Sequence, residues 1–345
     1  MPARPDPSGA GARRPPGRPR RPVGPPPEPA DIPVIPDDFA EDVRLRCGAD
    51  GERWLRDLPG LLNRYSRRWG LRISAEPFPL SYNYVVAARR HDGTDAVLKL
   101  CHPRTVELPL EAAALRHFGP RRAAEVLDAD LVGIEEYGGA LLLGRVRPGE
   151  SLVATAAADD LRATSAAAEV MRVLHEAGPP PDGFPSVADW GAGFARHRAA
   201  HGGGAGPLPA ELFEPAERLF AELLAGSAPP VLLHGDLHHD NILDGGDRWV
   251  AIDPKGVTGE PCYEAGALVR NLWQDRYDTP DEAGTLRRRI GLLADELAVD
   301  RERLAGWCFA QAVLSAVWLV EDGEDPGDVR AAVRTAGLLH GLLGG

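Results

Sequence analysis

Apolar and polar positions near the N-terminus follow a helical repeat. Aromatic and aliphatic residues recur there at steps of three and four, at Trp54, Leu58, Leu61, Leu62, Tyr65 and Trp69. This spacing places them on one face of an amphipathic helix, which Gly70 is expected to end. A shorter helix is predicted over residues 40–46, and residues 49–51 are expected to separate the two. Pro59 predicts a further interruption within the longer helix.

A second pattern, typical of β-strands, begins near Leu80. Residues 81–86 and 96–100 are apolar-rich runs joined by the turn Asp92-Gly93, so they predict a hairpin. Further strands are predicted over residues 123–130, 131–135 and 140–146, the last as a continuous apolar run. Residues 108–118 have helical composition, and a proline is tolerated in the first turn of such a helix.

Beyond the break at residues 147–150, the pattern is mainly helical. Helices are predicted over residues 159–177, 190–201, 209–225, 264–274, 281–298, 301–320 and 328–343. One β-hairpin is expected among them, with Gly245 and Gly246 as its loop and Asn241 opposite Val250. Residues 256–261 are expected to form a loop after this hairpin.

This order of elements predicts an α+β fold with two lobes. Residues 36–147 would form a small N-terminal lobe, in which a helical extension precedes an antiparallel sheet. Residues 148–345 would form a larger, mainly helical C-terminal lobe, with residues 147–150 as the hinge. Residues 1–35 are rich in Pro, Gly and Arg and almost without apolar residues, so they are predicted to be a disordered tail.

Composition narrows the classes of function. A net charge of −12 disfavours nucleic-acid binding, which needs a basic surface, and suits a cationic small molecule. No apolar run approaches the roughly 20 residues that span a bilayer, and the tail lacks the apolar segment of a secretory signal. The four cysteines show no C-x-x-C spacing and are expected to be reduced thiols. We therefore expect a cytoplasmic protein with neither nucleic-acid nor membrane partners; its oligomeric state stays open.

The polar cluster in the predicted hairpin carries the chemistry. Asp236 follows His234-Gly235, Asn241 comes five residues after Asp236, and Asp253 ends the return strand. The same Asp-to-Asn spacing occurs in the catalytic loop of kinases. Magnesium prefers oxygen ligands, which Asn241 and Asp253 provide, and phosphoryl transfer also needs a carboxylate for the acceptor hydroxyl, which Asp236 provides. The pattern predicts a phosphotransferase that uses ATP and Mg²⁺.

Two other interpretations of this cluster stay open. Three histidines and two aspartates between residues 234 and 240 would suit a zinc site, although the adjacent His238 and His239 are expected to point apart. A protein that binds nucleotide without catalysis is the second alternative. His234 is expected to hold the loop backbone. Lys255 is interpreted either as a phosphate or substrate contact or as an ordinary surface residue.

Two motifs resemble those of a known family. The H-G-D-x-x-x-x-N pattern of residues 234–241 and the run I-D-P-K-G of residues 252–256 are similar to the aminoglycoside/hydroxyurea antibiotic resistance kinases, which include streptomycin 6-kinases. The resemblance extends from about residue 37 to the C-terminus and implies a protein-kinase-like fold. It also implies that Asp236 is the catalytic carboxylate and that Asn241 and Asp253 hold Mg²⁺.

The resemblance further implies a nucleotide site in the N-terminal lobe. Lys99 ends an apolar strand and would contact the phosphates of ATP, while Glu111 would pair with Lys99, with Glu107 as the competing partner. The loop that would cover the phosphates departs from the kinase pattern, because Ser81 and Asn83 stand where glycines are expected. Both residues are therefore candidate phosphate contacts.

The substrate implied by the resemblance is streptomycin or hydroxyurea. Streptomycin carries guanidinium groups, so the acidic residues over 275–282 and 321–325 would suit it as a lining, although they would equally suit solvated helix ends. Glu260 is a further candidate substrate contact. Another small alcohol or amine also fits the motifs.

Overall fold

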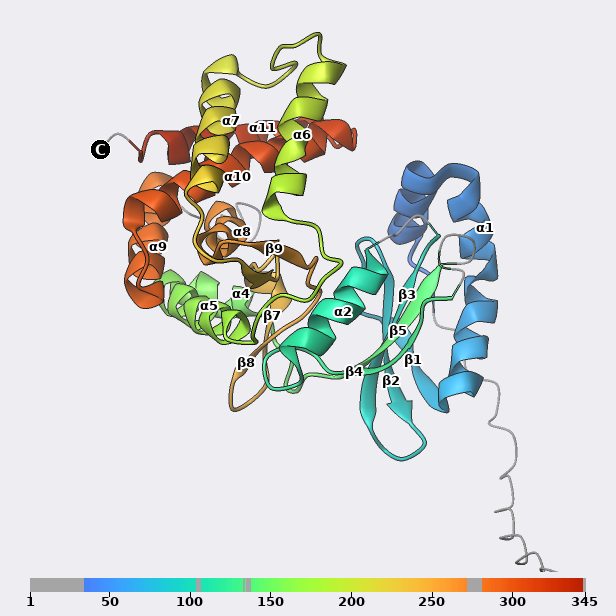
Figure 1. Ribbon diagram of the computed structural model, residues 1–345. Coiled ribbons are helices and arrows are strands. Elements are labelled where there is room, and N and C mark those ends of the chain that lie inside the picture. The colour runs from blue at the N-terminus through green and yellow to red at the C-terminus, as the bar shows by residue number, and fades with distance from the viewer. Residues whose placement is uncertain (1–33, 104–106, 133, 135–137, 272–280, 344–345) are drawn as a thin grey trace, which may run out of the picture. The chain divides into compact units, whose positions relative to one another are not determined.

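The computed structural model describes residues 34–103, 107–132, 134, 138–271 and 281–343 (Figure 1). The tail predicted over residues 1–35 lies outside these ranges except for its last two residues. Val34 donates its N–H to the carbonyl oxygen of Ala75 at 3.2 Å, and its own carbonyl accepts the hydroxyl of Tyr84 at 3.1 Å. These two hydrogen bonds hold the backbone of Val34 in place.

Five strands among these residues form one antiparallel sheet in the order β1-β2-β3-β5-β4. They are β1 (Leu71–Pro77), β2 (Tyr84–Arg90), β3 (Asp95–Cys101), β4 (Val126–Asp130) and β5 (Gly139–Gly144). A mainly helical region follows the sheet, which confirms the predicted α+β class.

Helix α1 (Asp37–Trp69) precedes the sheet and ends at Gly70, as its apolar stripe predicts. The break between the two predicted helices is a kink at Gly48, whose φ of 56° departs from helical geometry, rather than a separate loop at residues 49–51. The interruption predicted at Pro59 is wrong. A proline inside a helix costs about 3 kcal/mol, and the buried stripe on both sides of Pro59 outweighs that cost.

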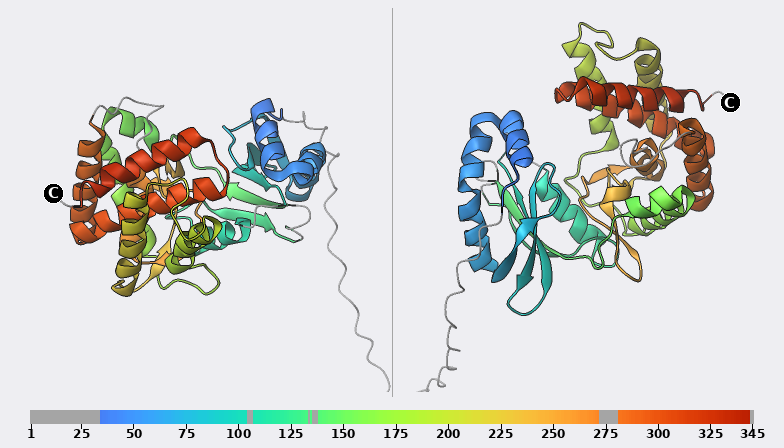
Figure 2. Two further views of the ribbon diagram at one scale, coloured as in Figure 1. Left: turned by 90° about the horizontal axis from the view of Figure 1, so that it is seen from above. Right: turned by 180° about the vertical axis from the view of Figure 1, so that it is seen from behind.

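The two faces of the sheet are covered by different helices, α1 on one and α2 (Leu108–Phe118) on the other (Figure 2). Leu98 and Leu100 of β3 belong to the apolar core under α1, whereas Leu141 of β5 belongs to the core that includes α2. Lys99 is opposite Leu141 in the strand register. Side chains alternate along a strand, so Lys99 projects toward α2.

The C-terminal part of the chain is mainly helical. Its helices are α4 (Leu152–Ala158), α5 (Asp160–His175), α6 (Val187–Ala200), α7 (Ala210–Ala225), α8 (Ala265–Arg270), α9 (Glu282–Leu297), α10 (Arg301–Glu321) and α11 (Pro326–His340). Helix α10 contacts α6, α7, α8, α9 and α11. Among the residues that the structure covers, α10 alone has the length and apolar composition of a membrane span, and 67% of that stretch is buried against the rest of the fold. Its apolar character is accounted for by its place in the core.

Two pairs of short strands frame the polar cluster. Strand β6 (Val231–Leu233) pairs with β9 (Val257–Gly259), so the loop predicted over residues 256–261 is partly wrong. Strand β7 (Ile242–Asp244) pairs with β8 (Trp249–Ala251). Both pairs are antiparallel and three residues long.

The register predicted for the β7–β8 hairpin is also wrong. Val250 lies opposite Leu243 rather than Asn241. The bend is shifted by one residue from the predicted Gly245-Gly246, because the N–H of Gly245 bonds the carbonyl of Arg248 at 2.8 Å and leaves residues 246–247 between the bonded pair. Asn241 nevertheless stays at the open end of the hairpin, where its carbonyl accepts the N–H of Ile252 at 2.9 Å.

Three further differences concern elements with weak local patterns. Strand β1 is an edge strand with one buried end, and its alternation is too short to predict. Helix α4 is seven residues of mostly alanine and was not expected. Where the structure describes residues 131–135, namely at Leu131, Val132 and Ile134, it has no strand, so that strand prediction is wrong there.

Candidate active site

The loop of residues 234–241 joins β6 to β7 and is held by the buried ring of His234. Its Nε2 donates to the carbonyl oxygen of Ile252 at 2.7 Å, and its Nδ1 accepts the N–H of Asp236 at 3.3 Å. Together these bonds specify one neutral tautomer of the ring. His234 therefore ties the loop to the segment that carries Asp253, in the structural role that the sequence suggests.

A second anchor of the loop, Glu264, was not foreseen from the sequence. Its carboxylate accepts the backbone N–H groups of His234 at 2.6 Å and of Gly235 at 2.9 Å. Burial alone would raise the pKa of Glu264, but the imidazole of His175, whose Nε2 lies 3.7 Å from Oε2 of Glu264, and the hydrogen bond from the Gly235 N–H hold the pKa below its ordinary value. Glu264 is thus a buried, ionised acceptor that supports the turn before Asp236. No short motif around residue 264 marks it for this role.

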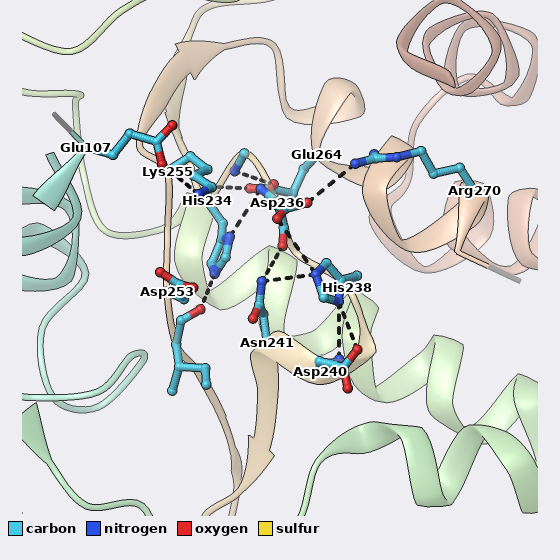
Figure 3. A network of polar contacts seen from close by, with 12 residues as sticks. Glu107, His234, Asp236, His238, Asp240, Asn241, Asp253, Lys255, Glu264 and Arg270 are labelled. Atoms are coloured by element: carbon cyan, nitrogen blue, oxygen red, sulfur yellow. Dashed lines mark hydrogen bonds and ion pairs between the residues drawn. The ribbon is translucent and has the colours of Figure 1, made fainter. Parts of the chain in front are cut away.

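Asp236 lies between two nitrogen-bearing side chains (Figure 3). Its Oδ1 is 3.4 Å from Nη2 of Arg270, and its Oδ2 is 3.7 Å from Nε2 of His238. Nη1 of Arg270 in turn donates to Oε1 of Gln311 at 2.9 Å. The Asp236 side chain is 28% exposed. An acceptor hydroxyl can therefore reach this carboxylate, whose orientation is set by its neighbours.

Asn241 is next to Asp236 through its backbone and side chain. Its Nδ2 donates to the carbonyl oxygen of Asp236 at 2.9 Å, which directs the amide oxygen away from that carbonyl. Asp253 follows β8 with a φ of 57°, a backbone conformation that non-glycine residues rarely adopt and that is frequent at functional positions. The loop and the hairpin thus bring one amide oxygen and one carboxylate to the same end of the β7–β8 pair (Figure 3).

Lys99 connects this cluster to the sheet. Its Nζ lies 2.7 Å from Oε2 of Glu111 and 2.6 Å from Oδ1 of Asp253. Burial would lower the pKa of Lys99, but the two carboxylates raise it above its ordinary value. Burial would likewise raise the pKa of Asp253, and the ammonium groups of Lys99 and Lys255 instead hold it well below that range. Lys99 is therefore charged, and it joins Glu111 of α2 to Asp253, which follows β8.

The choice between the two candidate partners of Lys99 is resolved by the contacts. Glu111 is 6% exposed in its side chain and bonds Lys99, whereas Glu107 bonds Lys255 at 2.6 Å. Oε1 of Glu111 is buried without a hydrogen-bond partner. Burial raises the pKa of Glu111 to about 7, against the opposing charge of Lys99.

Ser81 and Asn83 lie in the bend between β1 and β2. None of the contacts found in the described ranges joins either side chain to Lys99 or Asp253. Oδ1 of Asn83 is buried and has no hydrogen-bond partner.

The donor set of the site suits magnesium better than zinc. One amide oxygen and one carboxylate, Asn241 and Asp253, are hard ligands of the kind that hold Mg²⁺ with phosphates and water in the remaining positions. Across the described part of the chain, no three His, Cys, Asp or Glu side chains converge in a way that would hold a metal ion. The zinc interpretation of the loop histidines therefore has no geometric support there.

Other candidate substrate contacts have structural partners. Glu260 is buried and accepts hydrogen bonds from Arg303 and Trp307, so its predicted role as a substrate contact is wrong. Asp281 caps α9, and Asp325 caps α11.

Three of the remaining acidic side chains of the two clusters form ion pairs. Glu282 pairs with Arg334 at 2.7 Å, Glu321 with Arg196 at 3.2 Å and Glu324 with Arg46 at 2.6 Å. Asp275 and Asp278 lie outside the described residues.

The chain is similar to known kinases in sequence. The family described as aminoglycoside/hydroxyurea antibiotic resistance kinase matches residues 68–323. A streptomycin 6-kinase of Streptomyces griseus is 31% identical over 292 residues, which cover 84% of this chain and 92% of that protein. A hydroxyurea phosphotransferase of Kitasatospora aureofaciens is 33% identical over 294 residues, which cover 84% of this chain and 81% of that protein.

The fold is similar to that of a solved kinase. The solved structure of an amicoumacin kinase, in complex with AMP-PNP, Ca²⁺ and Ami, aligns with a TM-score of 0.58 at 13% identity. The alignment covers 88% of this chain and 96% of that one. At this identity the likeness shows the fold alone, and it confirms the kinase-like architecture that the order of elements predicts.

Proposed function

Because the chain belongs to the aminoglycoside/hydroxyurea antibiotic resistance kinase family, we propose that it transfers the γ-phosphoryl group of ATP to a hydroxyl group of a cationic aminoglycoside such as streptomycin. The proposal is supported chiefly by one observation. Asp236, Asn241 and Asp253, although spread over 18 residues of sequence, lie together at one end of the β7–β8 hairpin, with Lys99 bonded to Asp253.

Each of these side chains has a role that its contacts allow. Asn241 and Asp253 would hold Mg²⁺, which when bound supplies positive charge to the phosphates. Lys99, held by Glu111, would contact the phosphates of ATP. Asp236 would orient the acceptor hydroxyl and accept its proton as the acceptor oxygen bonds to the γ-phosphorus. The bond between that phosphorus and the bridging oxygen then breaks, and ADP leaves with the electron pair.

Two facts support a cationic acceptor. The chain has a net charge of −12, which favours the approach of cations, and its relative from Streptomyces griseus is a streptomycin 6-kinase. ATP is a cytoplasmic nucleotide, so the proposal also implies a cytoplasmic enzyme.

A second acceptor, hydroxyurea, is favoured by a different observation. The guanidinium of Arg270 lies beside Asp236, where the acceptor hydroxyl would bind. A fixed cation at this position weakens the binding of a polycation by repulsion, whereas it does not repel a small neutral molecule. The relative from Kitasatospora aureofaciens is a hydroxyurea phosphotransferase.

The decisive experiment measures magnesium-dependent ADP release from ATP with a panel of acceptors. The panel contains streptomycin, other aminoglycosides, hydroxyurea and simple amino alcohols, and Asp236→Asn is the isosteric control. We expect stimulation by streptomycin that is lost in Asp236→Asn, while the variant still binds ATP. Stimulation by hydroxyurea instead would select the second acceptor. ATP binding without stimulation by any acceptor would favour a nucleotide-binding regulator and contradict the proposed reaction.

A further inference from the structure

The chain contains an unusual distribution of positive charge. Of its 39 lysine and arginine residues, only Lys99 and Lys255 are lysines. An ammonium group is compact and carries its charge at one point, whereas a guanidinium is a broad planar fork. In a chain that uses arginine at every other basic position, both compact cations lie in the site that is proposed to bind ATP.

The two lysines are held very differently. Lys99 and its partner Glu111 are each 6% exposed in their side chains. Lys255 and its partner Glu107 are 33% and 54% exposed, although their N···O distance of 2.6 Å is as short. An ion pair that solvent reaches contributes little to stability, so the Lys255–Glu107 pair can exchange for a stronger anion.

The backbone of Lys255 is fixed beside the loop that carries Asp236. The N–H groups of Lys255 and Gly256 both bond the carbonyl oxygen of His234, at 2.8 and 3.1 Å. Gly235 has a φ of +86°, and a Cβ there would lie 2.7 Å from the ring of Trp190 and 3.4 Å from Cβ of Lys255. The glycine thus leaves room for the ring of Trp190, while Lys255 would meet such a Cβ only at an ordinary contact distance.

Figure 3 shows the Lys255 side chain beside Glu107, with Asp236 and Asp253 in the same group of polar residues. Lys255 is two residues from the proposed metal ligand Asp253, and its backbone N–H is bonded to His234 of the loop that carries the proposed catalytic Asp236. The phosphoryl group would pass between these two carboxylates.

We propose that Lys255 is a catalytic residue that leaves Glu107 when Mg·ATP binds and contacts the γ-phosphoryl group during its transfer. This inference rests on the proposed function. In the transfer, the γ-phosphorus gains a bond to the acceptor oxygen and loses its bond to the bridging oxygen of ADP, while Asp236 takes the hydroxyl proton. Lys255 forms no covalent bond; it balances negative charge on the phosphoryl oxygens, which is the main catalytic need of this reaction.

The first test uses the rarity of lysine in this chain. An amine-selective acetylating reagent should modify Lys255 much faster than the buried Lys99, and mass spectrometry separates both from the N-terminal amine. We expect Mg·AMP-PNP to slow acetylation of Lys255 by about tenfold and Mg·ADP, which lacks the γ-phosphate, to leave it nearly unchanged. Glu107→Gln should speed the acetylation in the nucleotide-free protein. Equal protection by the two nucleotides would overturn the proposal.

The second test measures turnover with an acceptor that stimulates the wild-type protein. Lys255→Met should lower kcat by about 100-fold with little change in the KM of the acceptor, because the lost contact strengthens only during transfer. Lys255→Arg should recover part of this loss. Arg44→Met, which removes an exposed cation paired with Glu52 at 2.7 Å, is the matched control and should keep full activity.

The outcomes separate the two proposals. Wild-type turnover combined with full activity of Lys255→Met would show that Lys255 is an ordinary surface residue and would leave the proposed function intact. No wild-type turnover with any acceptor would count against the proposed function, and protection of Lys255 by Mg·AMP-PNP alone would still support its contact with the γ-phosphate.

Discussion

Nη2 of Arg270 lies 3.4 Å from Oδ1 of Asp236, and Nη1 of the same guanidinium donates a hydrogen bond to Oε1 of Gln311 at 2.9 Å. Gln311 fits closely, because a Cβ on Gly266 would lie 1.8 Å from its Oε1. The C-terminal end of α8, which carries Arg270, is further fixed by buried Arg289, whose Nη1 donates to the carbonyl of Asn271 at 2.7 Å. Arg270 is thus a rigidly placed cation beside the proposed catalytic carboxylate.

The first prediction concerns this contact. Arg270→Met should lower kcat by about tenfold, because Asp236 loses the neighbour that fixes its orientation. The KM of streptomycin should fall in the same variant, since a repulsive charge beside the acceptor is removed, whereas the KM of hydroxyurea should not change. Steady-state ADP release with each acceptor measures both. Gln311→Leu should give the same changes at smaller size, and an unchanged kcat in Arg270→Met would show that Asp236 is positioned by other groups.

The second prediction concerns Glu264, which accepts two loop N–H groups in a fully buried position. Glu264→Gln replaces the carboxylate by an amide, whose single oxygen can accept only one of the two N–H groups in the same way. We expect a loss of about 2–4 kcal/mol in the free energy of unfolding, together with a lower kcat. Urea denaturation at neutral pH measures the loss.

The pH dependence of Glu264 follows from its lowered pKa. In the folded chain this carboxyl holds its proton less tightly than in the unfolded chain. Its contribution to stability is therefore present above the ordinary pKa of 4.5 and is lost as pH falls through the lower, folded value. The wild-type protein should lose stability over that acidic range more steeply than Glu264→Gln. Parallel curves for the two proteins would contradict the assignment of Glu264 as ionised.

The third prediction concerns the Lys99–Glu111 pair. The pKa of Glu111 is raised from 4.5 to about 7 in the folded chain, so the folded state keeps a proton that the unfolded state has lost. The resulting contribution to stability is present below pH 4.5 and is lost as pH rises toward 7. Lys99→Met removes the charge that opposes burial, so the loss should continue to higher pH, with a slope of up to about 1.4 kcal/mol per pH unit.

Unfolding free energies of Lys99→Met across neutral and alkaline pH test this expectation. The double variant Lys99→Met/Glu111→Gln is the control, because it has no carboxyl to titrate and should show no such slope. A flat profile for Lys99→Met would mean that Glu111 is ionised even without its lysine. Turnover should be lost in both variants, since neither retains the phosphate contact proposed for Lys99.

The features that the sequence predicts correctly depend on residues that are close together in the chain. Helix α2 carries a complete helical pattern over 108–118, and the structure has those bounds. Asp236, Asn241 and Asp253 are close in sequence, so a loop and one hairpin suffice to bring them together, and an error in the hairpin register did not separate them. Lys99 is recognisable because it is the one charged residue in the apolar run of residues 96–101, although β3 continues past it to Cys101.

Contacts between distant segments account for what the sequence does not predict. Glu264 is 30 residues from the N–H of His234 that it accepts, and Arg270 is 34 residues from Asp236. Neither position differs locally from an ordinary helical Glu or Arg. Strand β9 likewise forms only through its pairing with β6, so residues 257–259 have no strand pattern of their own. Such features depend on tertiary packing, which single-sequence patterns do not contain.

The fourth prediction separates the two proposed metal ligands by their different bonds. Asn241 has a second task, because its Nδ2 donates to the carbonyl of Asp236 at 2.9 Å. Asn241→Asp keeps an oxygen ligand but cannot donate this bond, so it should retain its Mg²⁺ requirement while kcat falls by about tenfold. Asp253→Asn keeps the shape of the side chain but removes its charge, so it should need at least about tenfold more Mg²⁺ for half-maximal ADP release.

Titration of ADP release with Mg²⁺ at fixed ATP distinguishes these two variants. Loss of a metal ligand raises the Mg²⁺ concentration needed for half-maximal ADP release. Loss of a hydrogen bond within the loop instead lowers the rate of ADP release at saturating Mg²⁺. Asp253→Asn also frees Lys99 from its bond at 2.6 Å, and the double variant Lys99→Met/Asp253→Asn shows whether that release contributes. If Asp253→Asn responded to Mg²⁺ as the wild type does, Asp253 would be a partner of Lys99 only, and the metal would have to be held elsewhere.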